Sequence, residues 1–128
     1  MKTIYTSYFG NVSKLNEDLC PISIAGRPPE GWFGKEYKVL APSWSIWKEW
    51  HDSTAPDRNE QYVKRFQKEI LKKLDPVKVV EDLTKLADGK APCLICYEKP
   101  TDFCHRHLVA EWLKKKLKKE IDAFEVFF

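Results

Sequence analysis

The stretch that most constrains this chain is residues 93–113, where an apolar run, a short polar turn and an amphipathic segment follow one another. The apolar run at residues 92–98 has the length of a buried strand, and Cys104-His-Arg-His opens a segment with helical spacing. This order predicts a strand, a tight loop and a helix. Such a junction gathers backbone N–H groups and the positive end of the helix dipole beside reactive side chains. We therefore expect the functional site at this helix N-terminus.

Length and charge narrow the class of protein. The chain has 128 residues, of which 43% are apolar and 13% aromatic, so we expect one packed domain over residues 1–128. The net charge of +3 gives only a weak preference for nucleic acid. No apolar run approaches the roughly 20 residues of a membrane span, and the N-terminal segment lacks the apolar core of a signal peptide. We expect a cytoplasmic protein without a membrane partner.

The remaining segments alternate between strand and helix patterns. Residues 2–8 and 21–25 read as strands, and a short helix at about residues 11–19 lies between them. Helices are predicted after Asp57 and after Asp75, and a last strand at residues 123–128. The order predicts an α/β fold: a single three-layer domain with a small, mostly parallel sheet of about four strands flanked by helices.

The expected sheet order places several polar residues together. In such sheets, ligands bind beyond the carboxyl ends of the strands, where the strand order reverses. If the four predicted strands lie in the order two-one-three-four, that point falls between the first and third strands. The residues that would meet there are Ser7, Tyr8, Arg27, Glu98 and the corner from Cys104 to His107.

Residues 27–54 form the long irregular part of the chain and carry four of the five tryptophans. A short helix capped by Ser43 would place Trp44 and Trp47 on one face. Two interpretations stay open. This segment is an aromatic flap packed over the core, or it is a roof over a ligand, with flat apolar rings such as Trp44 available for stacking.

The four cysteines are Cys20, Cys93, Cys96 and Cys104, and in a reducing compartment we expect thiols or metal ligands rather than disulfides. Cys93, Cys96, Cys104 and His107 have a zinc-like spacing. However, side chains alternate across a strand, so Cys93 and Cys96 face opposite sides of the sheet. We therefore predict no metal and no cofactor, and keep a zinc-stabilised module as an alternative.

The first turn of the expected helix has an unusual charge. Thr101 or Asp102 is the expected cap, and a Cys104 thiol in the first turn would have a depressed pKa. Basic residues are unfavourable at this end of a helix, so Arg106 requires an anion. That anion is either a ligand phosphate or an internal carboxylate such as Glu98 or Asp102. Cys104 and His105 would point about 100° apart on a helix, which argues against covalent catalysis by this pair.

The residues from Leu94 to Pro100, followed by Phe103-Cys-His-Arg-His-Leu-Val-Ala-Glu-Trp-Leu, resemble the family known as domain of unknown function 488. The opening Ile4-Tyr-Thr-Ser-Tyr and the Ala41-Pro-Ser-Trp segment are similar to its short members from phages and bacteria. The resemblance implies a compact α/β domain. It also implies that the defining residues of the family correspond to Cys96, Glu98, Cys104, His105 and Arg106.

These observations lead to two main hypotheses. The first is a domain that binds an anionic small molecule or nucleic acid, a nucleotide for example, at the Cys-His-Arg corner, with acid–base catalysis as an open question. Its candidate catalytic residues are Glu98, His105 and Cys104, and its candidate ligand-binding residues are Arg106, Arg27, Ser7, Tyr8, Trp44 and His107. The second is a non-catalytic interaction module in which Glu98, His105 and Arg106 form a structural hub.

Overall fold

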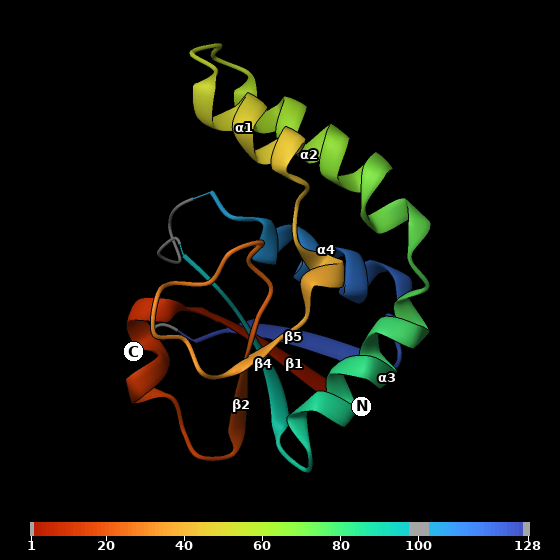
Figure 1. The fold of residues 1–128 in the computed structure, drawn as a ribbon. Coiled ribbons are helices and arrows are strands. Elements are labelled where there is room, and N and C mark those ends of the chain that lie inside the picture. The colour runs from red at the N-terminus through yellow and green to blue at the C-terminus, as the bar shows by residue number, and fades with distance from the viewer. Residues whose placement is uncertain (1, 98–102, 127–128) are drawn as a thin grey trace.

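The computed structural model describes residues 2–97 and 103–126, and within them five strands form one parallel sheet (Figure 1). The strands are β1 (Lys2–Tyr8), β2 (Leu19–Ser23), β3 (Lys35–Glu36), β4 (Ala91–Cys96) and β5 (Ile121–Glu125). The helices are α1 (Trp44–Asp52), α2 (Arg58–Glu69), α3 (Pro76–Ala87) and α4 (His105–Lys116), with 3-10 turns at Phe9–Lys14, Lys38–Leu40 and Leu71–Lys73. The predicted α/β class, with a small parallel sheet flanked by helices, is confirmed.

The strand order is β3-β2-β4-β1-β5, so the expected order two-one-three-four is wrong. β4 lies between β1 and β2, with Tyr5 opposite Cys93 and Ile22 opposite Leu94. The physical reason is burial, because five of the six residues of β4 are buried and such a strand belongs at the centre of a parallel sheet. The first and third predicted strands, which correspond to β1 and β4, are still neighbours, as expected.

The helices form two layers on the sheet. α3 packs against β2 and β4, and α4 packs against β1, β4 and β5. α1 and α2 pack on each other, and α2 contacts α4, so this pair lies farther from the sheet than α4 does (Figure 1). None of the helices in the described part of the chain has both the length and the apolar character needed to cross a membrane.

Local signals placed two helix starts correctly. Ser43 caps α1 by accepting a hydrogen bond from the Ile46 amide at 3.2 Å, and Asp75 caps α3 by accepting one from the Val77 amide at 3.0 Å. The expected helix after β1 is instead a 3-10 turn that ends at Lys14. The expected last strand begins two residues earlier, at Ile121, because its start pairs with Lys2 of β1.

Successive side chains of each strand lie on opposite faces of the sheet. On β4, Leu94 and Cys96 join the apolar core under the helices, whereas Cys93, although fully buried, is not part of it. This confirms the alternation expected from strand geometry. On β1 the same alternation separates Ser7 from Thr6. Ser7 hydrogen-bonds to the Val126 carbonyl and Asn11, while Thr6 binds Glu125. The site described below lies on the helix-covered face.

Asp75 and Asp57 give a direct test of the capping argument. Both precede a helix, but the Asp57 side chain makes no cap hydrogen bond and instead accepts from Gln61. We expect Asp75→Ala to lower the free energy of unfolding by about 0.5–2 kcal/mol and Asp57→Ala to lower it less. Urea unfolding followed by circular dichroism measures both. Equal losses would contradict the assigned caps.

Candidate functional site

A cavity of about 690 Å³ opens beyond the carboxyl ends of β2 and β4, beside the N-terminus of α4. α1 and α2 line the side of the cavity that faces away from the sheet. Its aromatic lining residues are Trp44, Trp47, Trp50, Tyr62, Tyr97 and Phe103. The position is the one at which parallel α/β sheets bind ligands, and the volume is that of a small-molecule site.

The aromatic side chains form two groups in the cavity wall. Trp44 and Trp47 stack with ring centroids 5.1 Å apart, as their spacing on one helix face predicted. Trp50 stacks on Phe103 at 5.9 Å, and Phe103 also meets Tyr62 edge to face at 5.1 Å. The second group therefore packs against the core, while Trp44 keeps 69% of its surface exposed. The packing of Trp50 agrees with the aromatic flap, whereas the roof over a ligand stays a prediction for Trp44.

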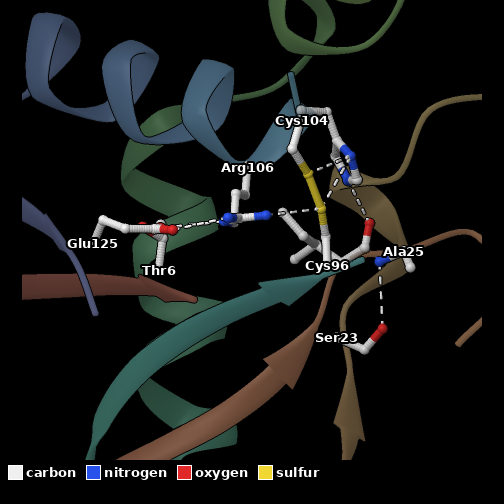
Figure 2. The surroundings of a disulfide bond; sticks show 9 residues. Thr6, Ser23, Ala25, Cys96, Cys104, Arg106 and Glu125 are labelled. Carbon is white, nitrogen blue, oxygen red and sulfur yellow. Dashed lines mark hydrogen bonds and ion pairs between the residues drawn. A yellow bond between two sulfur atoms is a disulfide. The ribbon is translucent and has the colours of Figure 1, made fainter. Parts of the chain in front are cut away.

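The opposite wall contains a Cys–His cluster. Cys96 at the end of β4 and Cys104 before α4 are joined by a disulfide (Figure 2). His105 Nδ1 lies 3.9 Å from each sulfur. The expectation of reduced cysteines is thus wrong for this pair and holds for Cys20 and Cys93, which are free. The reason is that α4 packs against β4, so that the end of the strand and the start of the helix meet.

Cys104 and His105 face the same point, contrary to the expected 100° separation. The expectation that Cys104 lies in the first turn is wrong, because α4 begins at His105 and Cys104 is its N-cap residue, with φ −153° and ψ 144°. The rotation of 100° per residue applies only within a helix, and Cys104 is extended. The cap expected at Thr101 or Asp102 lies outside the described residues, as does Glu98.

The ring of His105 is fixed by one backbone contact. Its Nε2 atom lies 2.8 Å from the carbonyl oxygen of Ile24, so Nε2 carries the proton and donates it to that oxygen. Burial lowers the pKa of His105 to about 4, with the nearby Arg106 acting in the same direction. The imidazole is therefore neutral at pH 7, and the lone pair on Nδ1 faces the two sulfur atoms.

Arg106 is fully buried, with 0% of its surface exposed, and its anion is Glu125 of β5. The guanidinium donates through Nη2 to Oε2 at 2.8 Å and through Nε to Oε1 at 3.2 Å, and its Nη1 points to the Cys96 sulfur at 3.6 Å (Figure 2). Thr6 donates a further hydrogen bond to Glu125. The anion required by Arg106 is thus internal, as one of the two alternatives predicted, and among the described residues it is Glu125.

The pKa of Glu125 reflects two opposing effects. Burial on its own raises it, but hydrogen bonds from Arg106 and Thr6, together with the charge of Arg106, bring it below its ordinary value. Register explains the contact, since β1 and β5 pair Thr6 with Glu125. The carboxylate is therefore charged at neutral pH and neutralises the buried guanidinium.

The predicted site residues divide into two sets. Cys104, His105, Arg27 and Trp44 all line the cavity. The others do not line it: Ser7, Tyr8, Arg106 and His107. Ser7 binds Asn11 and Val126 on the other face of the sheet.

His107 lies on α4 and has no role in the cavity wall. Its Nε2 atom is buried without a hydrogen-bond partner among the described residues. Burial lowers the pKa of His107, and Arg106 lowers it further. His107 is therefore neutral at pH 7, and no charge on it would attract an anion.

Sequence reasoning missed several contributors. The resemblance implied that Cys96 is a defining residue, but strand geometry alone assigned it to a buried strand, and only the observed end of β4 at Cys96 brings it to the site. Trp47 and Trp50 were noted only as part of the tryptophan segment. Glu125 and the Ile24 carbonyl carried no local signal, because their roles depend on strand pairing and on an 81-residue separation from His105.

Together these features define a small α/β domain with an aromatic cavity at the carboxyl edge of a parallel sheet and a Cys–His cluster in the cavity wall. A family model, DUF488-N3a, described as the active DUF488-N3 subclade, matches residues 12–117. The chain belongs to this family, which confirms the resemblance seen in its Cys-His-Arg motif. Neither the curated proteins nor the solved structures contain a significant match.

The Arg106–Glu125 pair is expected to be a major source of stability. Removing one partner of a buried pair leaves an uncompensated charge, so Arg106→Ala should lower the free energy of unfolding by about 3–5 kcal/mol. Lys48 is the control, because it pairs with Asp52 at 2.7 Å on the surface. Lys48→Ala should cost at most about 1 kcal/mol in the same urea titration. A smaller loss for Arg106→Ala than for Lys48→Ala would contradict the structural role.

The same pair should make stability depend on pH. Because the pKa of folded Glu125 lies below the ordinary value of 4.5, its contribution is present above pH 4.5 and is lost as the pH falls through the folded-state pKa. Urea unfolding of the native protein and of Glu125→Gln should therefore show a stability gap at pH 7 that narrows below about pH 4.5. A gap that stays constant down to pH 3 would contradict the assigned ionisation.

Proposed function

We propose that this domain binds a nucleotide-class ligand, a flat base joined to an anionic phosphate, in the aromatic cavity. The observation that carries the proposal is that one cavity combines exposed indole rings with the Cys-His corner at the carboxyl edge of the sheet. Its volume of about 690 Å³ is suited to a single nucleotide. The proposal keeps the predicted anionic ligand and moves its contacts away from Arg106.

Stacking would supply much of the affinity. Trp44 has one ring face against Trp47 and is 69% exposed, which leaves surface for a base. Stacking of a base on an aromatic side chain contributes about 1–3 kcal/mol. The paired indoles of α1 therefore favour a planar aromatic ligand over a purely aliphatic one.

Charge would select the anionic group. Arg27 is exposed at the edge of the cavity, and its guanidinium has no partner among the described residues. Tyr97 donates a hydrogen bond to the Arg27 carbonyl, which ties this rim residue to the end of β4. Arg106 is not available for this role, because Glu125 already neutralises it. We therefore assign phosphate binding to Arg27.

A second candidate function is a non-catalytic interaction module, and one observation favours part of it. Arg106 behaves as the centre of a hub, because it joins α4, β5 and Cys96 in the core. Such a hub and a binding cavity are compatible, since Arg106 is not among the cavity-lining residues. Weakened ligand binding in a folded Arg27 or Trp44 variant would favour the binding cavity, because both residues line it. No ligand binding by the native protein would favour the interaction module alone.

Tryptophan fluorescence titration with nucleoside monophosphates tests the proposal. Trp44→Ala should weaken binding by about 5-fold or more because it removes one stacking surface. Arg27→Ala should weaken binding of a monophosphate but leave binding of the parent nucleoside unchanged. Trp32→Phe is the matched control, since Trp32 lies outside the cavity and packs on Phe9.

Two outcomes would contradict the proposal. One is the absence of binding for every monophosphate at millimolar concentration in a folded protein. The other is equal weakening by Trp32→Phe and Trp44→Ala. A short single-stranded oligonucleotide in a parallel titration shows whether the base enters as a free nucleotide or as part of a strand.

A further inference from the structure

We propose that the reduced forms of Cys96 and Cys104, together with His105 Nδ1, hold one Zn²⁺ whose fourth position opens into the cavity. The three ligand atoms lie within 4.8 Å of one another, and all three residues are buried. This ligand set differs from the one suggested by sequence spacing, because it omits Cys93 and His107. The inference does not depend on nucleotide binding.

The tautomer of His105 is the first argument. A zinc-binding histidine presents an unprotonated nitrogen to the metal and donates its other N–H to a carbonyl or carboxylate. His105 has this arrangement, since Nε2 donates to Ile24 at 2.8 Å and Nδ1 faces both sulfurs. The carbonyl of Ile24 would act as the outer contact that holds the ring in place.

Distances are the second argument. Zn–S bonds of about 2.3 Å and Zn–N bonds of about 2.0 Å place tetrahedral N and S ligands roughly 3.6 Å apart. The two N···S separations here are already 3.9 Å. The Cα atoms of Cys96 and Cys104 are 7.4 Å apart, beyond the usual range of about 4.4–6.8 Å for bonded cysteines. Two thiolates around one ion fit this wider spacing, and only the sulfurs need to separate.

Charge is the third argument. Two thiolates and one Zn²⁺ are neutral together, and the Arg106–Glu125 pair beside them is also neutral. The Arg106 Nη1 atom, 3.6 Å from the Cys96 sulfur, would donate to the bound thiolate. Such contacts to ligand atoms are typical of the outer shell of zinc sites. The buried surroundings therefore suit a neutral Cys₂His zinc centre.

The cavity leaves the fourth coordination position of the proposed zinc ion open. Cys96, Cys104 and His105 all line it, and no further His, Cys, Asp or Glu side chain among the described residues belongs to the cluster. Three protein ligands with a free fourth position are typical of catalytic zinc, where water or substrate completes the tetrahedron. A ligand in the cavity would thus have direct access to the metal.

The disulfide and the metal site exclude each other. A thiol reductant such as dithiothreitol supplies two electrons and two protons, which convert the Cys96–Cys104 bond into two thiols while the reductant becomes a disulfide. Binding of Zn²⁺ then releases both protons. A small-molecule disulfide would reverse these steps: it accepts two electrons from the bound thiolates, takes up two protons to become two thiols, and the re-formed Cys96–Cys104 bond releases the ion.

The test is zinc analysis of the full chain after reduction, equilibration with ZnCl₂ and removal of excess metal, followed by the same experiment with Co²⁺. We expect about one metal ion per chain, and cobalt spectra with thiolate charge-transfer and tetrahedral d–d bands. Cys104→Ser should fold, because serine is a preferred N-cap residue, yet bind at least about 100-fold more weakly. Cys20→Ser, at a free cysteine outside the cavity, should bind like the native protein.

Three results would overturn the inference. The first is that a folded protein binds no metal although its Cys96 and Cys104 are shown to be free thiols after reduction. The second is equal affinity in Cys104→Ser and Cys20→Ser. The third, which rejects the open position, is a cobalt spectrum that does not shift when azide or imidazole is added. None of these measurements uses a nucleotide, so failure here and failure of the proposed function are distinguishable.

Discussion

The buried ion pair between Arg106 and Glu125 is the interaction on which the rest of the structure depends. It joins the first turn of α4 to β5 at the edge of the sheet, and its third guanidinium nitrogen reaches the Cys96 sulfur at the end of β4. Three elements that are far apart in the sequence thus meet at one charge. A buried arginine is tolerated only when such a partner is present, so this pair holds the start of α4 against the sheet.

That position has a consequence for the cavity. Because α4 begins directly above the carboxyl end of β4, Cys104 and His105 face Cys96 rather than solvent. α1 then encloses the remaining side with tryptophan rings, and α2 adds Tyr62. The charged pair supports the corner from behind, while the corner itself presents sulfur atoms and a neutral imidazole to the cavity. Structural and cavity-lining roles are therefore carried by neighbouring residues of one motif.

Local patterns in the sequence were sufficient for the elements but not for their pairing. Ser43 and Asp75 could be identified as caps, and the opposite faces of Cys93 and Cys96 followed from strand geometry. The central place of β4 and the role of Glu125 could not be predicted, because sheet order and register depend on contacts between distant segments. The meeting of Cys96 with Cys104 was also missed, since helical geometry was assumed for a residue that is in fact an extended cap.

We propose that ligand enters the cavity between the indole rings of α1 and the Cys–His wall. The chain has five tryptophans, and their indole N–H signals in a ¹⁵N-resolved NMR spectrum report on each position separately. On titration with a nucleoside monophosphate, the signals of Trp44, Trp47 and Trp50 should shift, while those of Trp32 and Trp112 should stay in place. Shifts confined to Trp32 or Trp112, or no shift at saturating concentration, would contradict the account.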